Sequence, residues 1–355
     1  MHKHSVDTPA LLLDLNVVEA NIAAMSAFFA GQRSRLRPHF KTPKTPEIAR
    51  RQLAAGAIGI TAAKLGEAET LARAGLGPIL IANQIVGAQK IDRLLALPEA
   101  VEVIVAVESE FNIRELEEGA ARSGRTPQAI IEVDTGMHRC GTMNPEETVE
   151  LAQRLLAGPV RYRGVMGYEG HAVLKRDEGE RQRLAHEALA TLSRHVAALR
   201  AAGLAPEIVS AGGTGTYDIA ATAPDVTEVQ AGSYVFMDGA YRAVRPDLGQ
   251  PALTLLTTVI ARHGDVAIID AGMKSLSSEF GPPQGEWRGL PITVMRLSEE
   301  HGHLNVEGTE IKPGDKVELV PSHGDTTINM HSEYFVTRGD EVVATWPIEA
   351  ARAYR

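Results

Sequence analysis

The chain has 355 residues, of which 44% are hydrophobic and 23% charged, with a formal net charge of −9. This length predicts two domains, or one large barrel with an appended domain, whereas the acidic balance disfavours nucleic-acid binding. The single cysteine excludes multi-cysteine metal sites and internal disulfides, and without a membrane span of roughly 18 apolar residues or a signal peptide the chain is predicted to be soluble and cytoplasmic.

Short apolar runs alternate with helical patterns over the first two-thirds of the chain. The runs are rich in Ile, Val and Leu, as expected of strands covered on both faces. The predicted strands are 36–41, 57–62, 78–82, 101–107, 129–134, 165–170, 207–211 and 227–232.

The segments between these runs have the spacing and the end signals of helices. Thr45 followed by Pro46 is typical of a helix start, and glycines at 75, 124 and 203 are typical of helix ends. Eight strands alternating with helices predict a closed (β/α)8 TIM barrel. The alternative is an open doubly wound sheet, but the early G-x-G-x-x-G turn that would support it is absent.

After about residue 245 the pattern changes to strand-like segments separated by glycine turns, without long helical patterns. We therefore predict a barrel domain over residues 1–245 and a C-terminal, mostly β domain over 246–355.

In a barrel, chemically active side chains lie at the carboxyl ends of the strands. The first predicted strand ends at Lys41, where desolvation or neighbouring cations such as Arg37 and His39 could activate the amine for Schiff-base chemistry. Lys44 and Lys64 are the alternatives for this role, and a solvated surface lysine is the structural alternative.

The fifth and sixth strands end in further polar groups. Arg139 follows the fifth and could orient a cofactor ring or a carboxylate, or form a structural salt bridge. Tyr168 and His171 follow the sixth, and the imidazole is a candidate general acid or base because it titrates near neutrality.

The last two strands are followed by loops of small residues. Backbone N–H groups in such loops can approach an anion closely, and this position is the usual phosphate site of barrels. The two loops are Ser210–Thr216 and Gln230–Tyr234, and plain tight turns are the structural alternative.

The C-terminal domain carries the segment Ser322-His323-Gly324-Asp325. In a strand-like conformation His323 and Asp325 would point to the same side, which predicts a partial site for a divalent cation. The absence of a thiolate favours Mn²⁺, with Mg²⁺, Co²⁺ or Zn²⁺ as alternatives, and Thr326, Thr327, Asn329 and His331 are candidates to orient the ligands.

Taken together, these segments resemble the alanine-racemase-like, fold-type III pyridoxal-phosphate enzymes, and within them the D-threonine aldolases and related D-serine dehydratases. They span nearly the whole chain in the order typical of that family. The segments are Asp7-Thr-Pro-Ala-Leu, Arg37-Pro-His-Phe-Lys-Thr, Asp134-Thr-Gly-Met-His-Arg-Cys-Gly, Gly167-Tyr-Glu-Gly-His, Ser210-Ala-Gly-Gly-Thr and Ser322-His-Gly-Asp.

The resemblance implies that Lys41 forms the Schiff base with pyridoxal 5'-phosphate. It implies that the phosphate binds the Gly-Gly-Thr and Gly-Ser-Tyr loops, here at Gly213, Thr214, Gly232, Ser233 and Tyr234. It also implies that Arg139 and Tyr168 lie near the pyridine ring. It also implies a homodimer in which each β domain completes the partner's site.

The resemblance further implies a pyridoxal-phosphate- and metal-dependent D-threonine aldolase, a lyase that cleaves D-β-hydroxy-α-amino acids. The related dehydratases carry a His-x-Cys pair where this chain has His323 and Asp325, and this difference favours the aldolase. The alternatives are a D-serine or 3-hydroxy-amino-acid dehydratase, a non-enzymatic pyridoxal-phosphate carrier, a racemase using Tyr334, and a metal-dependent barrel aldolase without pyridoxal phosphate.

Overall fold

The computed structural model describes all 355 residues and divides into two compact units. The barrel unit comprises residues 25–41, 48–232 and 353–355, and the β unit comprises residues 1–24, 42–47 and 233–352. The division predicted at residue 245 differs from this, because the first residues of the chain belong to the β unit, where the strand β1 (Ala10–Asp14) is hydrogen-bonded.

The barrel unit contains an eight-stranded sheet in which all strand pairs are parallel, in the order β2-β9-β8-β7-β6-β5-β4-β3. The segment after β2 joins β3, the strand at the other edge, through a parallel bridge between His39 and Thr61, where Phe40 N–H donates to the Thr61 carbonyl at 2.7 Å. The predicted barrel with an appended β domain is therefore confirmed. Each strand overlaps a predicted run, but β2, β6 and β7 begin before theirs and β4 ends after its own. The strands are β2 (Arg35–Leu36), β3 (Ile60–Ala62), β4 (Ile79–Gln84), β5 (Val103–Val107), β6 (Gln128–Val133), β7 (Arg161–Gly167), β8 (Ile208–Ala211) and β9 (Glu228–Val229).

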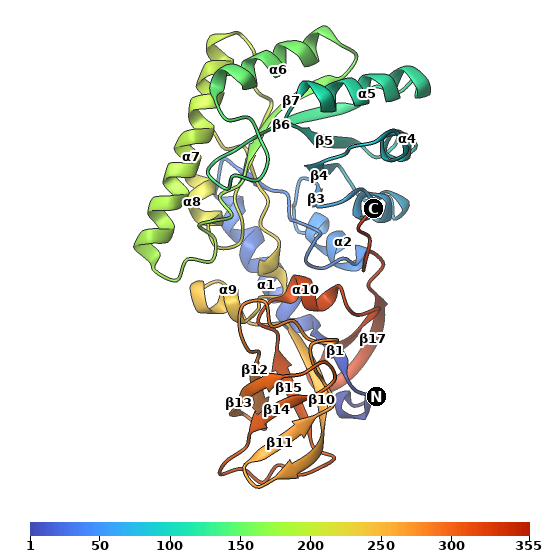
Figure 1. Cartoon of the computed structure of the whole chain (residues 1–355), viewed down its shortest axis with the longest axis vertical. Coiled ribbons are helices and arrows are strands. Elements are labelled where there is room, and N and C mark those ends of the chain that lie inside the picture. The colour runs from blue at the N-terminus through green and yellow to red at the C-terminus, as the bar shows by residue number, and fades with distance from the viewer. The chain divides into compact units, whose positions relative to one another are not determined.

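Helices connect consecutive strands and lie outside them (Figure 1). Local sequence explains where several begin: Asn144 accepts a hydrogen bond from Glu147 N–H at 2.9 Å ahead of Pro145, and Asp177 accepts one from Glu180 N–H at 2.7 Å. No helix has the length and the apolar character needed to cross a membrane. The helices are α1 (Leu15–Ala30), α2 (Pro46–Ala54), α3 (Leu65–Arg73), α4 (Ala88–Leu95), α5 (Glu110–Ser123), α6 (Pro145–Ala157), α7 (Glu178–Ala201) and α8 (Tyr217–Thr222).

A cluster of apolar side chains from successive strands packs together in the barrel unit. Leu80, Ile104, Ile130, Met166 and Ile208 are all buried and come from five neighbouring strands. Because such a core leaves no channel through the barrel, polar chemistry is restricted to the strand ends.

The β unit contains a nine-stranded, mostly antiparallel sheet (Figure 1). β1 lies inside this sheet, antiparallel to β10 and parallel to β16. Sequence analysis missed β1 and β12. The remaining strands are β10 (Leu253–His263), β11 (Val266–Ile269), β12 (Gln284–Trp287), β13 (Leu290–Leu297), β14 (Gly302–Asn305), β15 (Lys316–Val320), β16 (Glu333–Arg338) and β17 (Glu341–Pro347). Four short helices complete it: the 3-10 turns Lys3–Ser5 and Ser233–Val235, α9 (Gly239–Val244) and α10 (Gly324–Ile328).

A buried histidine between the outer helices predicts a pH-dependent stability. His195 on α7 is buried, its Nδ1 lies 2.7 Å from the Thr148 hydroxyl on α6, and burial lowers its pKa to about 4. The neutral form is therefore favoured in the folded state, so this stabilisation is complete above the unfolded-state pKa of about 6.5 and is lost as the pH falls towards 4.

The free energy of unfolding should fall between pH 7.5 and 4, and His195 should account for up to about 3 kcal/mol of that fall. We expect this part of the fall to be missing in His195→Asn. Urea unfolding of both proteins at the two pH values measures this difference. Equal pH dependence in the two proteins would show that His195 makes no contribution.

Candidate functional site

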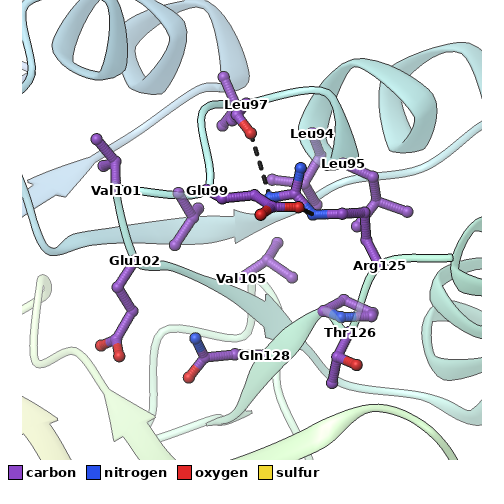
Figure 2. A pocket seen from close by; sticks show the side chains of 12 residues that line it. Leu94, Leu95, Leu97, Glu99, Val101, Glu102, Val105, Arg125, Thr126 and Gln128 are labelled. Carbon is purple, nitrogen blue, oxygen red and sulfur yellow. Dashed lines mark hydrogen bonds and ion pairs between the residues drawn. The ribbon is translucent and has the colours of Figure 1, made fainter. Parts of the chain in front are cut away.

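The barrel has a pocket at the amino-terminal ends of its strands, and the polar side chains at its edge make structural contacts. It has a volume of about 190 Å³ and lies beside the starts of β5 and β6. Figure 2 shows Arg125 at its edge, donating to the Leu97 carbonyl at 3.2 Å and pairing with Glu99 at 3.3 Å. Barrel active sites lie at the opposite, carboxyl ends of the strands, so the candidate site is described there.

Lys41 follows β2 at the carboxyl end of the barrel, directly after the bridge that joins the outer strands, and is half-buried. Arg37, predicted to act as a neighbouring cation, is instead buried and bidentate with Glu228, at 2.9 and 3.0 Å. Its charge is thus compensated within the sheet. That part of the prediction is wrong, and Arg37 joins β2 to β9.

Arg139 lies in the loop after β6, with its side chain about half exposed. One guanidinium nitrogen is 3.6 Å from Glu132, a buried carboxylate that also accepts a hydrogen bond from Gln84 at 2.6 Å. Burial raises the pKa of Glu132. This contact leaves most of the Arg139 fork open to a bound group. Cys140 beside it is a poor nucleophile, because burial and then the charge of Glu108 raise its pKa.

Tyr168 and His171 follow β7 and contact the neighbouring loops. The Thr135 hydroxyl after β6 donates to the Tyr168 carbonyl at 2.9 Å. A Cβ atom built on Gly136 would lie 3.3 Å from Cε1 of His171, so the imidazole lies close against this loop. His171 Nδ1 is buried and has no hydrogen-bond partner, so it is an unsatisfied polar atom beside this loop.

The loop after β8 lies against Tyr168. A Cβ atom on Gly213 would be 3.0 Å from Cε2 of the Tyr168 ring, and the neighbouring Thr214 is buried. After β9, a Cβ atom on Gly232 would be 2.8 Å from the His39 carbonyl oxygen. Both loops therefore need glycine for close backbone approach, which fits a phosphate cradle built from main-chain N–H groups.

The next two predicted phosphate residues belong to the β unit. Ser233 is buried, and its hydroxyl lies 3.4 Å from that of Thr42. Tyr234 is fully buried.

The predicted metal pair lies at a helix start in the β unit and not in a strand. His323 is the N-cap of α10 and Asp325 lies in its first turn, so the strand-like conformation expected for this segment is wrong. Even so, His323 Nε2 and Asp325 Oδ2 are 4.0 Å apart. Since small divalent cations bind such donors at about 2.0–2.2 Å, one ion can contact both atoms. No third His, Cys, Asp or Glu side chain joins them.

Asp238, which sequence analysis missed, orients this pair. Its Oδ2 lies 2.9 Å from His323 Nδ1 and accepts the Gly324 N–H at 2.9 Å, while its Oδ1 caps α9 at Tyr241 N–H. The carboxylate is buried. It therefore holds a hydrogen on Nδ1 and leaves Nε2 as the acceptor, the arrangement that metal-binding histidines need. The predicted orienting residue Thr327 instead donates to the His323 carbonyl.

This contact also sets the proton affinity of the imidazole. Burial lowers the pKa of His323, but the hydrogen bond that the imidazole donates to Asp238 and the charges of Asp325 and Asp238 outweigh this effect, so the pKa is raised. The ring of Phe280 packs edge-on against the imidazole, with centroids 5.0 Å apart.

We expect Asp238→Asn to weaken Mn²⁺ binding by about 10–100-fold. An amide has one oxygen and no charge, so it cannot accept from Tyr241 N–H on one side and from His323 Nδ1 and Gly324 N–H on the other. The hydrogen bond that keeps hydrogen on Nδ1 and the lone pair on Nε2 is therefore weakened. Calorimetric titration of the metal-stripped protein measures the change, and an unaltered Mn²⁺ affinity would contradict it.

The racemase alternative depends on Tyr334 as an acid–base group, but the surroundings of this side chain do not suit that role. It is fully buried and donates its hydroxyl hydrogen to the Pro43 carbonyl at 2.9 Å, with its ring 5.7 Å from that of Phe236. Burial also raises the pKa of the phenol. The structure therefore gives it a packing role.

Two family models match the chain. The alanine racemase N-terminal domain matches residues 13–239, and a serine dehydratase domain matches residues 252–337. Among characterised relatives, the chain is 38% identical to a D-threonine aldolase of Arthrobacter sp., over 97% of this chain and 93% of the relative. It is 34% identical to a 3-hydroxy-D-aspartate aldolase of Paracoccus denitrificans, over 99% and 93%.

Solved structures agree with these matches. The D-threonine aldolase from Filomicrobium marinum superposes with a TM-score of 0.95 at 34% identity, covering 99% of this chain and 98% of that one. A D-threo-3-hydroxyaspartate dehydratase variant in a metal-free form gives 0.88 at 31% identity, covering 98% of both chains. Alanine racemase of Clostridium difficile, at 15% identity and a TM-score of 0.76 with 97% and 99% covered, shares the fold.

Proposed function

Because the chain belongs to the alanine-racemase-like, fold-type III family of pyridoxal-phosphate-dependent enzymes, in the group of D-threonine aldolases and D-serine dehydratases, we propose that it is an aldehyde-lyase acting on D-β-hydroxy-α-amino acids. The proposed reaction converts D-threonine to glycine and acetaldehyde. The observation that carries the proposal is the facing pair of His323 and Asp325, an imidazole and a carboxylate without sulfur.

The ligand chemistry favours aldol cleavage over dehydration. The solved dehydratase variant that is described as metal-free has a cysteine replaced by alanine, whereas this chain has its single cysteine, Cys140, in the loop after β6. An oxygen ligand is harder than a thiolate and suits Mn²⁺ or Mg²⁺. A divalent ion held there would lower the pKa of the substrate's β-hydroxyl.

The barrel unit supplies the proposed cofactor site. Lys41 would hold pyridoxal phosphate, the loops at Gly213 and Gly232 would receive its phosphate, and Arg139 and Tyr168 would bind the ring. The cofactor supplies an electron sink for charge that develops at the substrate Cα. Two observations support this assignment. Gly213 brings the proposed phosphate loop against the Tyr168 ring, and His171 Nδ1 is a polar atom that has no partner within the chain.

His171 is the proposed base for the β-hydroxyl proton, which it would hold at Nδ1. We expect His171→Ala to lower kcat by about 10²–10⁴-fold at saturating Mn²⁺, with no loss of bound cofactor. Steady-state kinetics with cofactor quantified in the same samples measure both. Wild-type turnover in the variant would remove His171 from this role.

Product analysis tests the function itself. The purified protein is incubated with D-threonine, pyridoxal phosphate and Mn²⁺, and in parallel with 3-hydroxy-D-aspartate. Glycine with an aldehyde supports the aldolase. A 2-keto acid with ammonia would establish the dehydratase instead, the activity of a Delftia relative at 32% identity. We also propose a homodimer, which light scattering tests.

A further inference from the structure

A fully buried carboxyl group lies beneath the loop that follows β8. Glu169 comes two residues after the end of β7 and is 1% exposed. No ion pair is formed by this side chain, and neither the binding nor the proton-transfer steps proposed above use it.

The contacts of Glu169 go to the loop rather than to the strand before it. Its Oε1 lies 2.5 Å from the Thr216 hydroxyl, and its Oε2 accepts the Gly212 N–H at 3.2 Å. The Thr216 hydroxyl in turn accepts the Gly213 N–H at 3.2 Å. One carboxyl group therefore holds both ends of the segment from Gly212 to Thr216.

The side chain of Thr216 is diverted to make this contact. Thr216 is the N-cap of α8, a position at which a threonine hydroxyl ordinarily accepts a hydrogen bond from the first turn. Here its side chain makes no such bond, because the hydroxyl is directed to Glu169 and Gly213. The loop gains the hydrogen bond that the helix lacks.

The segment held in this way has an unusual path. Gly212 has φ of +83°, and a Cβ atom on Gly215 would collide with the Val173 carbonyl oxygen. A main chain that is left-handed at one residue and pressed against a neighbour at another needs an external constraint to stay in one conformation. Glu169 and Thr216 provide that constraint.

We propose that Glu169 is a positioning residue that, through Thr216, fixes the Gly212–Thr216 loop in the conformation that binds the phosphate of the cofactor. This inference rests on the proposed function, since that function places the phosphate on this loop.

The carboxyl group acts through the hydrogen bonds that its two oxygens make with Thr216 and Gly212. Burial raises the pKa of Glu169, and these hydrogen bonds oppose that rise. A glutamine can therefore replace it: the amide oxygen accepts from Gly212 N–H, and the amide NH₂ donates to a lone pair of Thr216.

The experiment compares pyridoxal phosphate with pyridoxal, which lacks the phosphate. We expect Glu169→Ala to weaken pyridoxal-phosphate binding at least tenfold while pyridoxal binding changes less than twofold, both measured by absorbance titration of the cofactor-free protein. Glu169→Gln is expected to restore the pyridoxal-phosphate affinity to within about threefold of wild type.

Thr216→Val removes the same hydrogen bond from the loop side. It replaces Glu169→Ala in the experiment if that variant does not fold. Thr148→Val, an equally buried hydroxyl on α6, is the matched control and should leave both affinities unchanged.

Two results would overturn the inference: equal losses for the two ligands, or wild-type pyridoxal-phosphate affinity in both Glu169→Ala and Thr216→Val. Absence of pyridoxal-phosphate binding in the wild-type chain would instead refute the proposed function, so the two failures are distinguishable.

Discussion

Lys41→Ala is expected to abolish the visible absorbance of lysine-bound pyridoxal phosphate and to lower turnover by about 10³-fold or more. Lys41 is half-buried in the loop beyond the carboxyl end of β2, and a lysine amine is the side chain that forms a Schiff base with an aldehyde cofactor. Absorbance spectra of the dialysed protein, followed by borohydride reduction and peptide mass analysis, measure the covalent link directly.

Two further variants make this prediction specific. Lys64 is exposed at the start of α3, so Lys64→Ala should keep both the absorbance and the activity. Lys41→Arg keeps the positive charge but cannot form the covalent link, and it should behave as Lys41→Ala does. A labelled peptide containing Lys44 or Lys64 would transfer the role to that residue.

Asp325→Ala is expected to lower metal-dependent turnover by more than about 100-fold while the cofactor absorbance stays as in the wild type. The substitution leaves His323 as the single side-chain ligand, because no third metal-binding side chain lies with the pair. Turnover and cofactor absorbance should respond differently because Lys41, the proposed cofactor lysine, lies in the barrel unit, whereas the proposed metal ligands lie in the β unit.

Metal removal is the complementary test. Chelation of the wild-type protein should reproduce the loss, and Mn²⁺ should restore turnover to the wild type but not to Asp325→Ala. Asp340→Ala is the matched control, since Asp340 is an exposed carboxylate of the same unit that pairs with Lys3. Turnover that persists after chelation would exclude a metal from the reaction.

The barrel was predictable because its signals are local. Strands covered on both faces are continuously apolar, so Val103–Val107 and Ile79–Gln84 are visible as short runs, and glycines at 75 and 124 with positive φ mark helix ends. The short strand β12 has the sequence Gln-Gly-Glu-Trp, which carries no apolar alternation, and it forms because β13 and β15 pair with its two edges.

The site was predictable only for residues that lie at strand ends or in marked motifs. Asp238 contacts His323 from 85 positions away, and Glu169 is one acidic residue among 45. Glu169 lies within the segment Gly167-Tyr-Glu-Gly-His, where Tyr168 and His171 are the more evident candidates, and no motif marks Asp238. The importance of both residues comes from burial and from partners that the fold provides. The helix at Gly324–Ile328 is too short to show a helical period, which explains why a strand was expected there.

The position of β1 has a consequence for synthesis of the chain. Ala10–Asp14 pairs with strands that begin at residues 253 and 333, so a segment that leaves the ribosome early has no partners until nearly the whole polypeptide has been translated. Such distant pairing carries a large loop-closure cost and slows folding. A fragment beginning at residue 233 would lack this strand and expose two unpaired edges, the kind of surface on which sheets of different molecules join.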